Sequence, residues 1–400
     1  MKRSLITNFV VSCSTVLLSV KGKIFDLRIM IFLSILSGCI EPYDPALKDG
    51  DMNYVVVDAF LNASDGTATA RLSYSQPVKS SGPVPRVLDA SVSIDEENGG
   101  SYPLSMGAPG VYSATIPGVS VGKRYRLVIK THDSHEYVSE FTSVINAPPI
   151  DSITWSVHRD GIRIEITSHD DTGSTKYFKW NYTETYEYKS RLHSQFMFSN
   201  GIVVRRSDEQ LISTCWRTDP SSQISIGTVK HLQQSVLSKH PLTLIPYGSR
   251  KLYVKYSILV QQQGLTEENY NYWLNLEKST ENLGGLFDPL PSEIHGNIRC
   301  VNHAGENALG LFSASTVTEM RKYISRNDLP VDLRGEFVDK TYCEVDTVLL
   351  SELPNLLETT LFIDAVYEAS PFPVGYTTAF PSCGDCRYWG GQPIRPLFWE

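Results

Sequence analysis

Residues 54–74 read YVVVDAFLNASDGTATARLSY, and this stretch decides the fold class. Residues 54–61 form an apolar, β-branched run that is typical of a buried strand, and residues 64–66 (SDG) are a turn signal. From residue 67 to 74, small or apolar residues alternate with polar ones, which is the period of a half-buried strand. The stretch therefore predicts two strands joined by a tight turn.

The same pattern continues along the following residues. Further β-branched or alternating runs, each bounded by turn-forming residues, cover residues 90–94, 111–115, 124–130 and 136–141. Short strands at this spacing are typical of an antiparallel sandwich. We therefore expect an immunoglobulin-like or fibronectin-like β-sandwich over residues 51–148, able to fold alone.

A second region of strands follows the two prolines at 148 and 149, where we place a domain boundary. Alternating or aromatic runs recur at residues 153–157, 162–166, 177–188 and 252–260. A helix is expected near residues 266–282, with Thr266 as its cap. Its aromatic residues Tyr270 and Trp273 are interpreted as core packing, not as a cofactor site. The chain is therefore predicted to be mainly β, with a larger β-rich domain over residues 149–400 and a helical insertion.

The N-terminal residues resemble an export signal. Residues 31–39 read IFLSILSGC, they follow basic residues, and an acidic, proline-containing segment comes next. An apolar run that ends in Leu-Ser-Gly-Cys resembles a lipoprotein processing site, so residues 1–38 are predicted to be a signal peptide, Cys39 the lipidation site and residues 39–50 a tether. Cys13 lies in a weaker, similar context. The alternative is a core helix or strand with a buried Cys39.

Composition limits the classes of partner. The chain has 36 Lys and Arg against 44 Asp and Glu, a net charge of −8. Removal of residues 1–38 takes away five basic and one acidic residue, which leaves 31 against 43. Such an acidic protein is a poor partner for nucleic acid. The chain has 21 Tyr and 6 Trp, and these residues, where exposed, suit contacts with a glycan or a peptide; the alternative is that they form the cores of two large β-domains.

Few residues in the chain point to catalysis or metal binding. His132 and His135 have the spacing of a ligand pair but lack further ligands, so a solvated loop is expected. The acidic segments 95–97 and 170–171 lack the spaced oxygen ligands of a calcium loop, and solvated turns are expected there too. No nucleophile elbow or phosphate-binding loop is present in the sequence. We therefore predict no catalytic residue, no metal and no cofactor.

Five cysteines follow Cys39, namely Cys215, Cys300, Cys343, Cys383 and Cys386. An exported protein is expected to form disulfides, and an odd number leaves one thiol over. The CxxC at Cys383 and Cys386 lies in a Gly- and Pro-rich tail, so we interpret it as structural, with each cysteine bonded to Cys215 or Cys343. Four cysteines allow three pairings, and the order stays open. A redox pair of Cys383 with Cys386 is the alternative.

Segments spread along the chain resemble those of a known family. They are residues 39–45 (CIEPYDP), 256–262 (YSILVQQ), 286–298 (LFDPLPSEIHGNI), 383–391 (CGDCRYWGG) and 396–399 (PLFW). In order and spacing they resemble the Bacteroidetes lipoproteins called the domain of unknown function 4249 family. The resemblance implies four shared cysteines, those at 215, 343, 383 and 386, with Cys300 as the free thiol.

The family assigns no activity, but its members often accompany TonB-dependent receptors. The resemblance therefore implies a non-enzymatic lipoprotein of the outer membrane, lipid-anchored on its periplasmic or cell-surface side. It would be a binding or accessory partner of a TonB-dependent β-barrel receptor in nutrient uptake. A structural or adhesive module of the cell envelope is the alternative, followed by a glycoside hydrolase with a pair of carboxylates.

Overall fold

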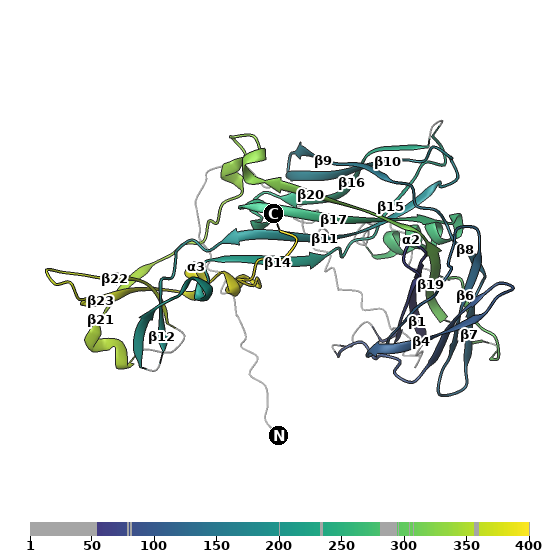
Figure 1. The fold of residues 1–400 in the computed structure, drawn as a ribbon, viewed down its shortest axis with the longest axis horizontal. Helices are drawn as coiled ribbons and strands as arrows, with labels where there is room; N and C mark the ends of the chain where they lie inside the picture. Colours follow the sequence, from purple (N-terminus) through teal and green to yellow (C-terminus); the bar gives the residue numbers. More distant parts are fainter. Residues whose placement is uncertain are drawn as a thin grey trace, which may run out of the picture. The chain divides into compact units, whose positions relative to one another are not determined.

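The computed structural model describes residues 54–399 except residues 78–79, 81, 200, 233–234, 281–293, 295, 304, 307 and 356–359. The predicted signal peptide, tether and Cys39 lie outside the described residues. Within them the chain is mainly β, with four sheets and one longer helix (Figure 1). The predicted fold class is confirmed.

The first sheet folds back on itself to form a sandwich. Its strand order is β18-β7-β6-β3-β4-β5-β2-β1-β19, with β8 beside β6. The strands are β1 (Val55–Asn62), β2 (Thr67–Tyr74), β3 (Ser91–Glu96), β4 (Ser101–Ala108), β5 (Val111–Thr115), β6 (Arg124–Lys130), β7 (Glu136–Ser139), β8 (Thr142–Ser143), β18 (Ile298–Cys300) and β19 (Ala308–Ser315). The first half of β4 pairs with β3 and the second half with β5, so β4 belongs to both layers.

Two strands of this sandwich come from the distant segment 298–315. β19 runs parallel to β1, and β18 runs antiparallel to β7. The buried side chain of Asn297 joins them: its Nδ2 donates to the Phe312 carbonyl at 2.8 Å, and its Oδ1 accepts from the Phe312 N–H at 2.9 Å. The Phe312 ring lies in the sandwich core beside residues such as Leu61 and Leu72.

Two further sheets pack on a common core. One has the order β16-β10-β9, and the other has the order β14-β11-β17-β20 with β15 beside β11. Their bounds are β9 (Ile150–His158), β10 (Gly161–His169), β11 (Tyr177–Lys189), β14 (Thr214–Pro220), β15 (Ser225–Thr228), β16 (Val236–Pro246), β17 (Lys255–Leu265) and β20 (Val317–Ser325). Trp180, Ile162 and Ile258 are fully buried in this core, and the Trp180 indole N–H donates to Gln262 Oε1 at 2.8 Å.

The helix expected near residues 266–282 is α2 (Glu267–Thr280). The Thr266 hydroxyl accepts a hydrogen bond from the Asn269 N–H at 3.2 Å, as an N-cap does. α2 packs against β11, β15 and β17 of one sheet and against β19 of the sandwich. In the described ranges no helix has both the length and the apolar character to cross a bilayer.

A small sheet of order β13-β12-β22-β23-β21 joins strands from residues 196–205 with strands from residues 345–379, and several short helical turns occur between residues 208 and 389. Its strands are β12 (Phe196–Ser199), β13 (Ile202–Arg205), β21 (Val345–Leu349), β22 (Leu361–Val366) and β23 (Gly375–Ala379). The turns of the chain are α3 (Pro381–Gly384), η1 (Asp208–Gln210), η2 (Arg250–Leu252), η3 (Arg326–Asp328), η4 (Arg334–Glu336), η5 (Leu350–Asn355) and η6 (Cys386–Trp389).

Candidate functional site

The histidine motif is not assembled into a metal site. The His132 side chain is 87% exposed, whereas His135 Nδ1 lies 2.7 Å from Asp133 Oδ2 and its ring meets that of His303. Among the described residues, no group of three or more His, Cys, Asp or Glu side chains could hold a metal ion.

The acidic segments have structural partners. Asp95, Glu96 and Glu97 form ion pairs with basic residues on or next to β6, at distances between 2.7 and 3.1 Å. Asp170 is buried, contrary to the expectation of a solvated turn. Its carboxylate accepts hydrogen bonds from the N–H groups of Thr172 and Thr175, which offset the loss of water.

The structure pairs four of the cysteines in two disulfides. Cys215 bonds to Cys386, and Cys343 bonds to Cys383. Neighbouring cysteines of the CxxC thus have different partners, which resolves the open pairing order and leaves no dithiol pair there. In the described part of the chain Cys300 is the free thiol.

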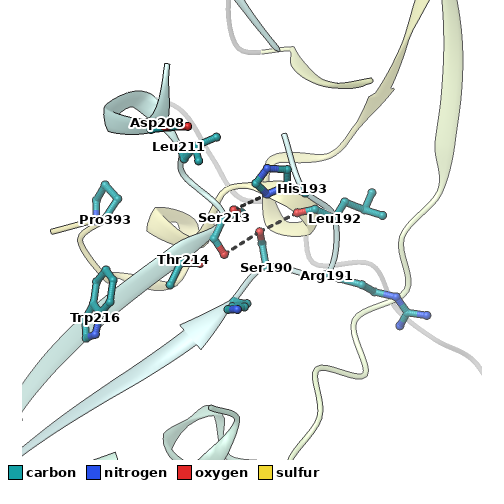
Figure 2. Close-up of a pocket in the computed structure, with 11 residues that line it drawn as sticks. Ser190, Arg191, Leu192, His193, Asp208, Leu211, Ser213, Thr214, Trp216 and Pro393 are labelled. Atoms are coloured by element: carbon teal, nitrogen blue, oxygen red, sulfur yellow. Dashed lines mark hydrogen bonds between the residues drawn. The ribbon is translucent and has the colours of Figure 1, made fainter. Parts of the chain in front are cut away.

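A cavity of about 420 Å³ lies where the end of β11 meets the start of β14 (Figure 2). His193 Nδ1 lies 2.7 Å from Ser213 Oγ, and the Ser190 hydroxyl donates to the Leu192 carbonyl at 2.8 Å. The Ser190 N–H also donates to the Ser213 carbonyl at 2.8 Å. These bonds join two chain segments next to Cys215. They satisfy the polar groups of the buried Ser213, so a structural role explains its position.

A second hollow, of about 480 Å³, lies between the sandwich and the sheet that contains β11 and β17. We call it the groove. Strands β1, β2 and β19 line one side, and β11, β17 and α2 line the other. The lining residues used below are Asp58, Asp65, Arg71, Lys179, Asn181, Gln261, Gln263 and Trp273.

Alternation along β11 explains why polar side chains reach the groove. Phe178 and Trp180 point into the core and are fully buried, so the odd-numbered residues between and after them occupy the opposite face. In the register with β17, Lys179 lies opposite Gln263 and Asn181 lies opposite Gln261. Four polar side chains therefore share one patch of the sheet.

Several of these polar groups have no partner in the chain. Among the described residues, the side chains of Lys179, Asn181 and Gln263 make no hydrogen bond and no ion pair. Gln263 is only 7% exposed, and the indole N–H of Trp273 is buried without an acceptor. Buried polar groups in proteins nearly always have a partner, so Gln263 and the Trp273 indole N–H are suited to bind water or a ligand, with the half-buried Lys179 and Asn181 beside them.

The other charged residues of the groove are already paired. Asp58 Oδ2 lies 3.4 Å from Arg71 Nη1, and Asp65 Oδ1 accepts the Thr67 N–H at 2.8 Å. Lys179 instead places its Nζ 3.8 Å from the centroid of the Trp273 ring, a cation–π contact. Burial lowers the pKa of Lys179 to about 8, and the nearby Asp58 carboxylate only partly opposes this effect.

None of the groove residues was predicted as a site from the sequence. Trp273 was interpreted as core packing, and Lys179 reads as the polar position of an alternating strand. The one available signal was the polar run 261–263 (QQQ) inside an otherwise apolar strand.

One family model matches the chain. It has the description "Domain of unknown function (DUF4249)" and covers residues 40–321. Every residue that lines the groove falls within this range, whereas Cys343, Cys383 and Cys386 lie beyond it. A comparison with curated proteins gives no match.

Proposed function

This chain belongs to the family described as Domain of unknown function (DUF4249), and we propose that it is a non-enzymatic, ligand-binding lipoprotein of the outer membrane of a Bacteroidetes cell. The groove binds the ligand, and a lipid on Cys39 holds the protein at the membrane. Its partner is a TonB-dependent receptor that takes up the ligand.

The observation that supports this proposal most is the set of unpartnered polar groups in the groove. Lys179, Asn181 and Gln263 come from two adjacent strands and share one face. Gln263 is buried, and leaving a buried polar group unpaired costs roughly 1–3 kcal/mol, whereas Lys179 and Asn181 are half-buried and accessible to a ligand. A ligand with matching hydrogen-bonding groups offsets this penalty, as it does in binding sites with a few convergent polar groups.

The carboxylates of the groove favour binding over hydrolysis. A glycoside hydrolase needs one carboxyl group as the acid and a second as the nucleophile or base. Asp58 is ion-paired with Arg71, and Asp65 accepts the Thr67 N–H, so both are engaged. A glycoside hydrolase therefore stays the less favoured alternative.

The groove predicts a direct binding experiment. The double variant Asn181→Ala/Gln263→Ala should lose most of the binding to those glycans of an array that the wild-type protein retains. Asn275→Ala is the control, because Asn275 is exposed on α2 and does not line the groove. Equal binding by the double variant and the control would contradict a role for the groove.

The lipid anchor is tested by fractionation. Cys39→Ala should release the protein from the membrane or mislocalise it, because acyl chains anchor by burying methylene groups at about 0.8 kcal/mol each. Cys13→Ala is the matched control and should leave the protein in the membrane fraction. If the Cys39→Ala variant stays in the membrane fraction and still needs detergent, Cys39 is not the anchor.

The receptor partner is tested by affinity purification from solubilised membranes followed by mass spectrometry. Stable recovery of a TonB-dependent receptor supports the uptake role. Recovery of the protein without any receptor favours the structural or adhesive alternative.

A further inference from the structure

We infer that the groove binds a saccharide that carries an anionic group, and that Lys179 holds this group. The inference rests on the proposed function, because it names the ligand class of the same groove.

The surroundings of Lys179, not the net charge of the groove, point to an anion. The charged lining residues are Asp58, Asp65, Arg71 and Lys179. Asp58 pairs with Arg71 at 3.4 Å, and Asp65 accepts the Thr67 N–H. In the described chain no carboxylate lies within ion-pair distance of the Lys179 ammonium, although Asp58 is near enough to act on it electrostatically. An ammonium removed from water without a counter-charge is unfavourable, and an anionic ligand supplies that charge.

Trp273 fixes the position of the ammonium before the ligand arrives. Its ring lies 3.8 Å from Lys179 Nζ and faces it from α2, whereas Gln263 lies beside Lys179 on the sheet. A lysine held in this way loses less side-chain entropy on binding than a free surface lysine.

The hydrogen-bonding groups of the groove suit a saccharide better than a peptide. Extended peptides bind mainly through main-chain hydrogen bonds to a sheet edge. Four of the lining strands, β1, β2, β11 and β17, have neighbours on both sides, whereas β19 and β20 end their sheets. Over these four strands the groove presents side-chain amides and hydroxyls, such as those of Asn181, Gln263 and Thr183, and sugar hydroxyls complement them.

Calorimetry on the exported full-length chain tests the inference with three trisaccharides of equal length. One is a galacturonate with carboxylates, one a sulfated galactose, and one an uncharged galactose. An acidic probe should bind at least tenfold more tightly than the uncharged one, and the two acidic arms distinguish carboxylate from sulfate. Lys179→Gln should remove this preference, whereas Lys322→Gln, an exposed lysine on β20, should retain it.

The pH dependence separates a direct charge contact from a structural role. The charged groups that face Lys179 are Asp58 on β1 and Arg71 on β2. Tyr272 on α2 is near the same carboxylate, and its pKa is raised mainly by burial, so it keeps its proton in this range. Because free Lys179 loses its proton above a pKa of about 8, affinity for the acidic probe should fall up to tenfold per pH unit above 8. Lys179→Arg keeps its charge and should abolish this decline.

The outcomes distinguish this inference from the proposed function. Equal affinity for charged and uncharged probes, with Lys179→Gln unaffected, overturns the inference but leaves a ligand-binding groove. Binding of peptides in place of saccharides likewise overturns the inference and leaves a ligand-binding groove. If no probe binds and the wild-type protein retains no glycan on the array, both this inference and the proposed ligand-binding function are overturned. The melting temperature of Lys179→Gln is measured as a control for folding. If it equals or exceeds that of the wild-type protein, a loss of binding by this variant is not caused by unfolding.

Discussion

At the scale of single residues, two glycines allow the strands that close the sandwich to approach each other. Gly310 in β19 has φ +122°, and a Cβ placed there would lie 1.8 Å from the Val57 carbonyl oxygen. A Cβ on Gly296, just before β18, would lie 1.5 Å from the Gly310 carbonyl oxygen. Neither position can accept a side chain without separating the backbones.

Gly310→Ala should therefore destabilise the protein by at least about 2–3 kcal/mol, because it adds both a clash and a strained backbone conformation. The midpoint of urea unfolding measures this loss. Gly335→Ala in η4 is the control, since no atom lies within 4 Å of a Cβ at that position. Similar midpoints for the two variants would show that the close approach at Gly310 does not limit stability.

At the scale of elements, β18 and β19 complete a sandwich whose other strands lie between residues 55 and 143. β19 covers the free side of β1 along its whole length and brings Ala308, Phe312 and Ala314 into the core. Without these strands, β1 becomes an open edge, which invites pairing with other chains.

A fragment of residues 52–149 should therefore aggregate or lack cooperative unfolding, although the sequence alone led us to expect that this region folds by itself. Attaching residues 294–316 to it through a flexible linker should restore a cooperative transition, because β18 and β19 can then pair. Circular dichroism during urea titration compares the unfolding transitions of the two fragments. If both fragments unfold cooperatively at the same urea concentration, the two distant strands are not required.

At the scale of the whole molecule, the disulfides tie the C-terminal tail to the body. Cys215 and Cys386 are 171 residues apart and fully buried, whereas Cys343 and Cys383 are 40 residues apart. In the chain-entropy model, loops of these lengths correspond to about 5 and about 4 kcal/mol of stabilisation.

Cys215→Ala/Cys386→Ala should lower the melting temperature by several degrees or more, and Cys343→Ala/Cys383→Ala should lower it somewhat less. Cys300→Ala, which removes the free thiol, is the control and should change little. Calorimetric melting with and without reductant measures these shifts. Wild-type stability in both double variants would mean that the tail is held by packing alone.

Local patterns predicted much of the strand content. β2, β5 and β6 have the bounds expected from alternation, and α2 begins directly after its Thr266 cap. Alternation predicts a strand because it reports which side chains of a segment are buried together. β4 was missed, because Pro103 and Gly107 interrupt its pattern where the strand passes from one layer of the sandwich to the other.

The sequence by itself determined the mainly β class, the helix and the presence of structural cysteines, all of which depend on neighbouring residues or on composition. Only the tertiary structure decided the cysteine pairing, the recruitment of β18 and β19, and the groove. Asp58, Lys179 and Trp273 are far apart in the chain, and each has an ordinary local context. Periodicity shows that Lys179 lies on the polar face of a strand. It does not show that another sheet and a helix form a groove over that face.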